Sequence, residues 1–140
     1  MKSYTYTHKT QYYETDQMGV VHHSNYIRWF EEARVFFLEE IGYPYNRLEK
    51  ELKLISPVME VGCQYRGMVH FGDTVDITLK VKSSNGIRLK FVYEIHDHET
   101  GELRTTGFST HCFLDETGAF VFLKKTYPEL YTILKECTQE

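Results

Sequence analysis

Apolar residues recur along the chain with two different periods, and the change of period separates a helical region from a region of strands. Between Ser24 and Ile41 they recur at helical spacing, which predicts a long helix with Ser24 or Asn25 as its N-cap. Gly42 follows where a left-handed residue commonly ends a helix. Two apolar stripes run along this segment: Ile27, Phe30, Ala33, Phe37 and Ile41 in one, and Trp29 and Phe36 in the other. So wide an apolar arc indicates a helix that is covered by a sheet.

Elsewhere apolar and polar residues alternate, which is typical of half-buried strands. The alternation is clearest at 74–82 and 89–95, and Asn85-Gly86 between them predicts a hairpin turn. Further strands are expected at 4–12, 58–65 and 103–114. Helical segments are expected at 45–54, which is charged, and at 127–136, which carries Pro128 in its first turn.

The predicted order is a strand, the long helix and then an antiparallel meander, which gives an α+β fold of two layers. With 140 residues the chain is long enough for one domain with a core, so we expect a single domain over residues 1–140. One helix cannot cover both faces and both edges of a sheet of about five strands. We therefore expect at least a homodimer, with the functional site near the interface.

Composition narrows the class of protein. Hydrophobic residues make up 41% and charged residues 26%, and the net charge is −4 without a basic stripe, which argues against nucleic acid as a partner. The first residues lack the apolar core of a signal peptide, and no apolar run is long enough to span a membrane. Cys63, Cys112 and Cys137 have no paired spacing. We expect reduced thiols in a cytoplasmic protein, with Cys63 and Cys112 as small core residues.

The stretch 13–26 concentrates more candidate chemistry than any other part of the chain. Asp16 could be a turn residue, but it precedes the long helix across Gly19 and is too distant to be its ordinary N-cap. Val20 and Val21 are expected to desolvate its carboxylate. Beside free N–H groups at a helix N-terminus, such a carboxylate can act as nucleophile or general base while those groups stabilise an oxyanion.

The histidines are weaker candidates. His22 and His23 are adjacent and do not share a face, so they make a poor metal pair, and each could be a structural or surface residue. His23 lies nearer the helix start and is the better candidate for acyl chemistry, through its side chain or its backbone N–H. No metal site is expected at His96 and His98, because residues 97–101 have the sequence of a turn. The helix glutamates are expected on a solvated face: Glu31, Glu32, Glu39 and Glu40.

Residues 14–26, Glu-Thr-Asp-Gln-Met-Gly-Val-Val-His-His-Ser-Asn-Tyr, closely resemble the signature of the 4-hydroxybenzoyl-CoA thioesterase family of hotdog-fold acyl-CoA thioesterases. The likeness is strongest to the small bacterial branch associated with the Tol–Pal genes, although that branch commonly has tyrosine where this chain has His22. It continues through several later positions: Tyr65, residues 71–75, Gly107, Thr110 and residues 127–130.

The resemblance implies a hotdog fold, in which the sheet wraps around one long central helix, and a homodimer that often pairs into a homotetramer. It implies hydrolysis of acyl-CoA, with Asp16 as the catalytic carboxylate and the backbone N–H near His23 as the oxyanion donor. The other site residues lie in the same stretch: Gly19, Val20, Val21, His22, Asn25 and Tyr26. No cofactor is implied, because coenzyme A is part of the substrate. The alternatives are a hotdog dehydratase, a thioesterase acting on acyl carrier protein and a non-catalytic acyl-CoA-binding module.

Overall fold

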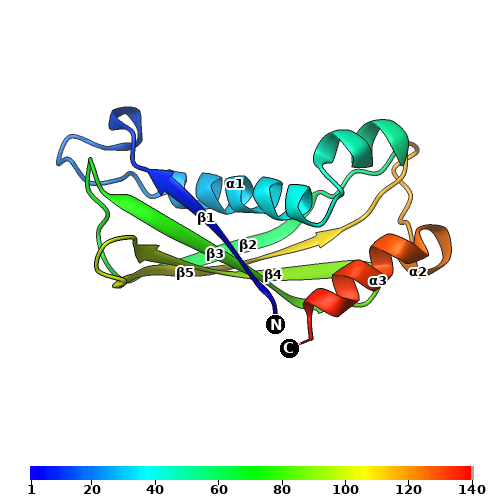
Figure 1. The fold of residues 1–140 in the computed structure, drawn as a ribbon. Helices are drawn as coiled ribbons and strands as arrows, with labels where there is room; N and C mark the ends of the chain where they lie inside the picture. The colour runs from blue at the N-terminus through cyan, green and yellow to red at the C-terminus, as the bar shows by residue number, and fades with distance from the viewer. Residues whose placement is uncertain (140) are drawn as a thin grey trace.

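A computed structural model describes residues 1–139, which contain one five-stranded antiparallel sheet and three α-helices (Figure 1). The strands are β1 (Ser3–Lys9), β2 (Val58–Tyr65), β3 (Thr74–Ser84), β4 (Arg88–Asp97) and β5 (Leu103–Cys112). Their order across the sheet is β1-β3-β4-β5-β2. The helices are α1 (Ser24–Glu40), α2 (Leu123–Thr126) and α3 (Pro128–Cys137). Single helical turns at Tyr12–Glu14 and Arg47–Glu51 complete the elements.

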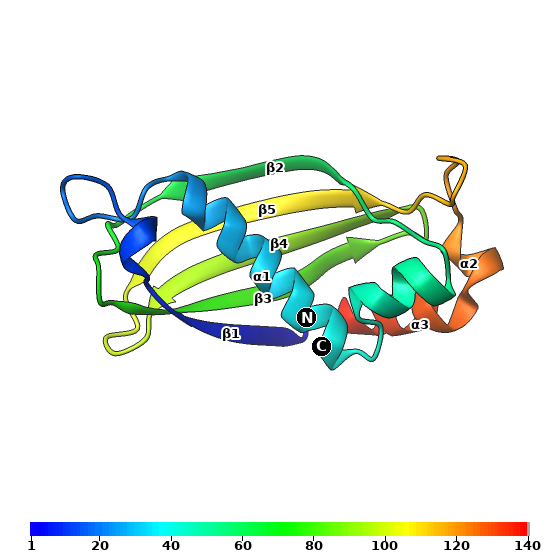
Figure 2. The ribbon, with the colours of Figure 1, turned by 90° about the horizontal axis from the view of Figure 1, so that it is seen from above.

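Helix α1 lies diagonally across one face of the sheet, which Figure 2 shows from above. In β3 and in β4 the alternation turns one set of side chains toward this helix and buries it, while the other set is half-buried or exposed over most of each strand. Phe30 of α1 stacks on Tyr93 of β4 with the ring centroids 4.2 Å apart. A Cβ atom on Gly107 would come within 2.5 Å of the Phe30 ring. Glycine at this position of β5 therefore allows the helix to approach the sheet closely.

The five-stranded antiparallel sheet is confirmed, whereas the helical layer differs from the prediction. Helix α3 adds Leu130, Leu134 and Cys137 to the same core, so α1 is not the only helix that covers apolar surface. The first strand is shorter than expected, because β1 ends at Lys9 and residues 12–14 form a helical turn. Neither α1 nor any other helix within residues 1–139 is long and apolar enough to cross a membrane.

All three cysteines are free thiols, as expected. Cys112 is buried, which confirms its place in the core, but Cys63 is only half-buried because it lies on the edge strand β2. Cys137 is also buried, and its Sγ lies 3.6 Å from the hydroxyl of Tyr4. Strand β2 leaves its large apolar side chains exposed: Val58, Met59, Val61 and Tyr65. Strand β2 therefore combines a sheet edge that is unpaired within residues 1–139 with exposed apolar side chains.

A series of buried, hydrogen-bonded polar side chains links α1 to the sheet. Arg34 donates from Nη1 to the Tyr93 hydroxyl at 3.1 Å, and that hydroxyl lies 2.6 Å from Ser109 Oγ. Ser109 Oγ in turn lies 2.8 Å from Nε2 of His111. Burial, followed by the nearby positive charge of Arg34, lowers the pKa of His111 to about 4. His111 is therefore neutral in the folded protein at neutral pH.

The lowered pKa of His111 predicts a pH-dependent stability. An unfolded histidine has a pKa of about 6.5, so between pH 6.5 and 4 the unfolded chain binds the extra proton and the free energy of unfolding falls as pH falls. Urea unfolding across this range should show a decline that is smaller in His111→Gln. The control His98→Gln changes an exposed histidine outside this network. An unchanged slope in His111→Gln would contradict the assignment.

Candidate active site

A tight loop carries Asp16 away from the sheet before the chain enters α1. The Asp16 N–H donates to the Val20 carbonyl at 2.8 Å, and the Gly19 N–H donates to the Asp16 carbonyl at 3.1 Å. Gly19 has a φ of +76°, the left-handed conformation that its turn requires. The loop is tied to the segment before β3 because Val21 N–H donates to the Val69 carbonyl at 2.8 Å.

The Asp16 carboxylate is exposed on this chain. Its Oδ1 accepts the Met18 N–H at 2.8 Å, which closes the turn. The expected desolvation by Val20 and Val21 is not seen: Val21 is buried and Val20 half-buried, but both leave the carboxylate in solvent. The loop projects from the body of the molecule, with Met18 82% exposed, so neighbours in sequence do not shield Asp16.

The start of α1 also differs from the prediction. Ser24 is the first helical residue and His23 precedes it in a helical conformation, so neither Ser24 nor Asn25 is the N-cap. Nδ1 of His22 accepts the Ser24 N–H at 3.3 Å, whereas the Asn25 amide turns inward and donates to the Glu14 carbonyl at 2.8 Å. The hydrogen bonds of residues 1–139 give the His23 N–H no acceptor, and the first turn carries no acidic side chain. The positive end of this helix is therefore available to an anion.

A hollow of about 340 Å³ lies beside the start of α1. Four of the predicted site residues line it: Val20, Val21, His23 and Tyr26. Tyr65, Arg66 and Met68 close it from the facing segment. Asp16 and Gly19 lie on the adjoining loop, and neither they nor His22 or Asn25 line the hollow. Four of the eight predicted site residues therefore line this hollow, and the other four lie outside its wall.

Tyr65 lines this hollow, although the strand pattern gave no signal for such a place and only the family resemblance included it. Its hydroxyl donates to the His23 carbonyl at 3.1 Å, and its ring meets Tyr26 edge-on with the centroids 5.0 Å apart. Burial, with a hydrogen bond to Cys63, raises the pKa of Tyr65 to about 12. The phenol therefore stays protonated and can donate this bond at any ordinary pH.

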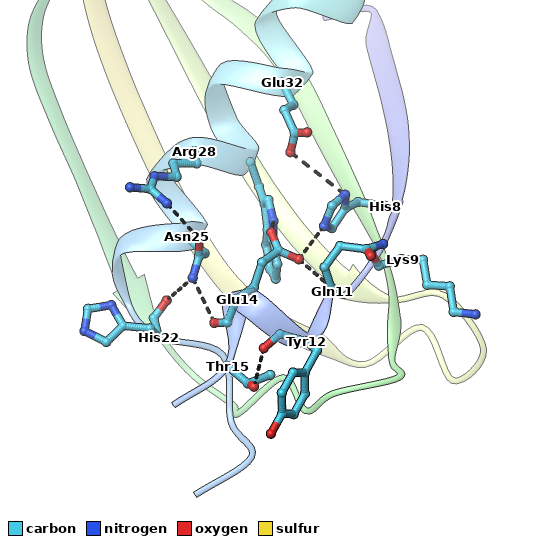
Figure 3. Close-up of polar contacts among 11 residues, drawn as sticks. His8, Lys9, Gln11, Tyr12, Glu14, Thr15, His22, Asn25, Arg28 and Glu32 are labelled. Atoms are coloured by element: carbon cyan, nitrogen blue, oxygen red, sulfur yellow. Dashed lines mark hydrogen bonds and ion pairs between the residues drawn. The ribbon is translucent and has the colours of Figure 1, made fainter. Parts of the chain in front are cut away.

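Glu14 is the second residue whose role the sequence did not reveal. It is only 5% exposed, and its carboxylate accepts hydrogen bonds from groups on several elements (Figure 3). Oε1 accepts the Gln11 N–H at 2.7 Å and lies 2.8 Å from His8 Nε2, while Oε2 accepts Trp29 Nε1–H at 2.7 Å. Burial by itself would raise the pKa of Glu14. The hydrogen bonds from Gln11, His8 and Trp29 outweigh burial and hold the pKa below its ordinary value.

The structure also bears on Glu32 and on the two adjacent histidines. Glu32 was expected on the solvated side of the helix, but it is half-buried and its Oε2 lies 3.9 Å from His8 Nδ1. The rings of His22 and His23 lie against each other with centroids 4.1 Å apart. Within residues 1–139, no three histidine, cysteine or acidic side chains are grouped so as to hold a metal ion.

Comparisons with known proteins show the family and the fold of this chain. The sequence profile described as the thioesterase-like superfamily matches residues 10–129. YneP of Bacillus subtilis, whose name provisionally describes an acyl-CoA thioesterase, is 31% identical over 125 residues, which cover 89% of each chain. The structure of a DHNA-CoA thioesterase from Staphylococcus aureus superimposes with a TM-score of 0.89 and is 30% identical, covering 95% of this chain and 89% of that one. A Thermus thermophilus protein of hypothetical function gives a TM-score of 0.88 at 33% identity, covering 99% of this chain and all of that one.

Proposed function

This chain belongs to the thioesterase-like superfamily and is a thioester hydrolase, and from that premise we propose that it cleaves acyl-CoA to the free acid and coenzyme A at the N-terminus of α1. The observation that carries the proposal is the His23 N–H, which has no acceptor within residues 1–139 and belongs to a residue lining a hollow beside the Asp16 loop. An N–H at this end of a helix can hold the negative charge that develops on a thioester oxygen.

The finer assignment follows the signature at residues 14–26. On that basis we propose that the chain belongs to the 4-hydroxybenzoyl-CoA thioesterase family, in the branch associated with the Tol–Pal genes. Residues 1–140 form one hotdog domain in this proposal, and α1 is its central helix. The names of YneP and of the Staphylococcus aureus enzyme support coenzyme A, rather than acyl carrier protein, as the thiol.

In the proposed reaction the thioester carbonyl lies over the start of α1, with its oxygen at the His23 N–H. As a general base, Asp16 removes a proton from a water molecule, whose oxygen adds to the carbonyl carbon. The tetrahedral intermediate then collapses, the C–S bond breaks and the thiolate leaves and takes a proton. As a nucleophile, Asp16 adds to the carbonyl carbon itself, the thiolate leaves, and water hydrolyses the resulting anhydride. Both routes need an ionised oxygen at Asp16.

We expect Asp16→Asn to keep the fold and acyl-CoA binding but to lower kcat by ~100-fold or more, since an amide can neither accept the proton nor attack. The measurements are thiol release, acyl-CoA binding and thermal melting on the same preparation. Glu116→Gln, which neutralises an exposed carboxylate in another turn, is the matched control. Turnover close to that of the wild type in a folded Asp16→Asn protein would refute the assignment.

The backbone of His23 should matter more than its ring. His23→Ala keeps the N–H, so part of the activity should remain, whereas His23→Pro removes this donor and should abolish most of the activity. Steady-state thiol release and circular dichroism on both variants separate loss of the donor from loss of the helix start. A folded proline variant with full activity would exclude this N–H as the oxyanion donor.

The exposed edge of β2 supports a proposed homodimer, which could pair further into a tetramer. Tyr65 lies at the end of this strand, 50% exposed, and also closes the hollow beside α1. A second copy paired along β2 would therefore cover apolar surface and shield the proposed site from water at the same time.

Light scattering at micromolar concentration should give at least a dimer. Val61→Glu should weaken the dimer and lower activity in parallel, because a charge would be buried in the paired edge. Ile87→Glu is the control, since Ile87 and Val61 are each 40% exposed but Ile87 lies in the hairpin turn after β3. A fully active, stable monomer would contradict the proposal.

A further inference from the structure

We propose that Glu14 is a positioning residue of this reaction: it holds the Asp16 loop in a fixed place relative to the N-terminus of α1. The inference rests on the proposed function, because it assigns Glu14 a role that acts through Asp16. Glu14 itself is buried beneath the loop and does not line the hollow beside α1. It is therefore not expected to touch the substrate, and we assign its influence to the geometry of other groups.

The main chain of Glu14 joins the two ends of the loop. Its carbonyl oxygen accepts the His22 N–H at 2.8 Å, so the residue that opens the loop is bonded to a residue that closes it. The same oxygen accepts the Asn25 side-chain amide at 2.8 Å, which connects it to the first turn of α1. Figure 3 shows Asn25 reaching from the helix to Glu14. One oxygen atom thus ties the loop and the helix start together.

The side chain of Glu14 adds anchors farther from the loop. Oε2 accepts the indole N–H of Trp29, which lies one turn after Asn25 and is fully buried. Oε1 meets His8 of β1 and the N–H of Gln11. Contacts to two successive turns of the same helix oppose both sliding and rotation of residue 14 against α1. Asp16 lies two residues farther along the chain, so a fixed position of residue 14 also restrains Asp16.

The main chain of Asp16 is hydrogen-bonded within its own loop, to Val20 and Gly19, and these bonds do not reach α1. Its carboxylate is exposed and receives one hydrogen bond, from Met18 within the same turn, so nothing on α1 holds it directly. The other links of the loop, Val21 N–H to the Val69 carbonyl and Phe71 N–H to the Gly19 carbonyl, lead to the segment before β3 and not to the helix. The loop's own hydrogen bonds set its shape, and the bonds of Glu14 to His22, Asn25 and Trp29 set its place against α1, so the spacing between Asp16 and the His23 N–H depends on Glu14 as well. Displacement of a reacting group by about 1 Å can cost about 100-fold in rate.

The donor set at Glu14 explains why a carboxylate is needed. Three nitrogen atoms, from Gln11, His8 and Trp29, surround two oxygens that can only accept. Gln is nearly isosteric, but its NH₂ group must face at least one of these nitrogens. A buried donor without an acceptor is unfavourable, so the Gln variant should relax by shifting the residue and the loop attached to it.

A double-mutant cycle on kcat tests this role. The four proteins are wild type, Glu14→Gln, Asp16→Asn and the double variant, assayed by thiol release well below their melting temperatures. We expect Glu14→Gln to lower kcat by ~10-fold or more with KM changed by less than ~3-fold, while in the Asp16→Asn background the same change should cost less than ~3-fold. Glu32→Gln is the control, because Glu32 contacts the other nitrogen of His8 and makes no contact with the loop.

The outcomes separate this inference from the proposed function. If Glu14→Gln lowers kcat equally in both backgrounds, or not at all, the positioning role is overturned while Asp16 keeps its role. If Asp16→Asn itself retains full turnover, the proposed function fails first. If Glu14→Gln does not fold, Trp29→Phe replaces it in the cycle, since phenylalanine keeps an aromatic ring in the buried site but removes the donor to Oε2. We expect Trp29→Phe to lower kcat in the wild-type background but much less in the Asp16→Asn background. An equal reduction of kcat in both backgrounds would overturn the inference.

Discussion

The buried carboxylate of Glu14 is the constraint on which the arrangement of the site depends. Removing a charge from water costs several kcal/mol unless donors replace the lost hydration, so the residue must keep all its partners at once. Those partners come from β1, from the turn that follows it and from the second turn of α1. The hydrogen bonds of this one carboxylate therefore connect the end of β1, the start of α1 and the place where the Asp16 loop leaves the sheet.

Regular structure was predictable because its signals are local. Strand 58–65 has the expected bounds, and α1 covers the stretch whose apolar residues recur at helical spacing, because each alternation or helical repeat refers to residues nearby in sequence. The N-cap was wrong for a tertiary reason: the Asn25 amide is engaged by the carbonyl of a residue eleven positions earlier. Glu14 could not be predicted as a hub, since the fold alone brings His8 and Trp29 to it. The exposure of Asp16 was missed because adjacent valines were taken to be spatial neighbours as well.

The exposure of Asp16 connects the proposed chemistry to the unpaired sheet edge. Water around the site weakens the field of a helix N-terminus. Tyr65 bridges the two features, because it ends β2 and also fixes the His23 peptide through its carbonyl. In this account one chain supplies only part of the site. Glu14 and Tyr65 position the Asp16 loop and His23, and a second copy of the chain excludes water.

The most direct test of the central claim is a crystal structure of the Asp16→Asn protein with an intact acyl-CoA bound. The account predicts that the thioester oxygen lies about 2.7–3.1 Å from the His23 backbone nitrogen, the distance of an oxyanion contact, with residue 16 facing the carbonyl carbon. A larger hollow of about 590 Å³ lies elsewhere on the sheet, beside Arg88 and Lys135. An acyl-CoA bound there, with its thioester away from the start of α1, would contradict the account.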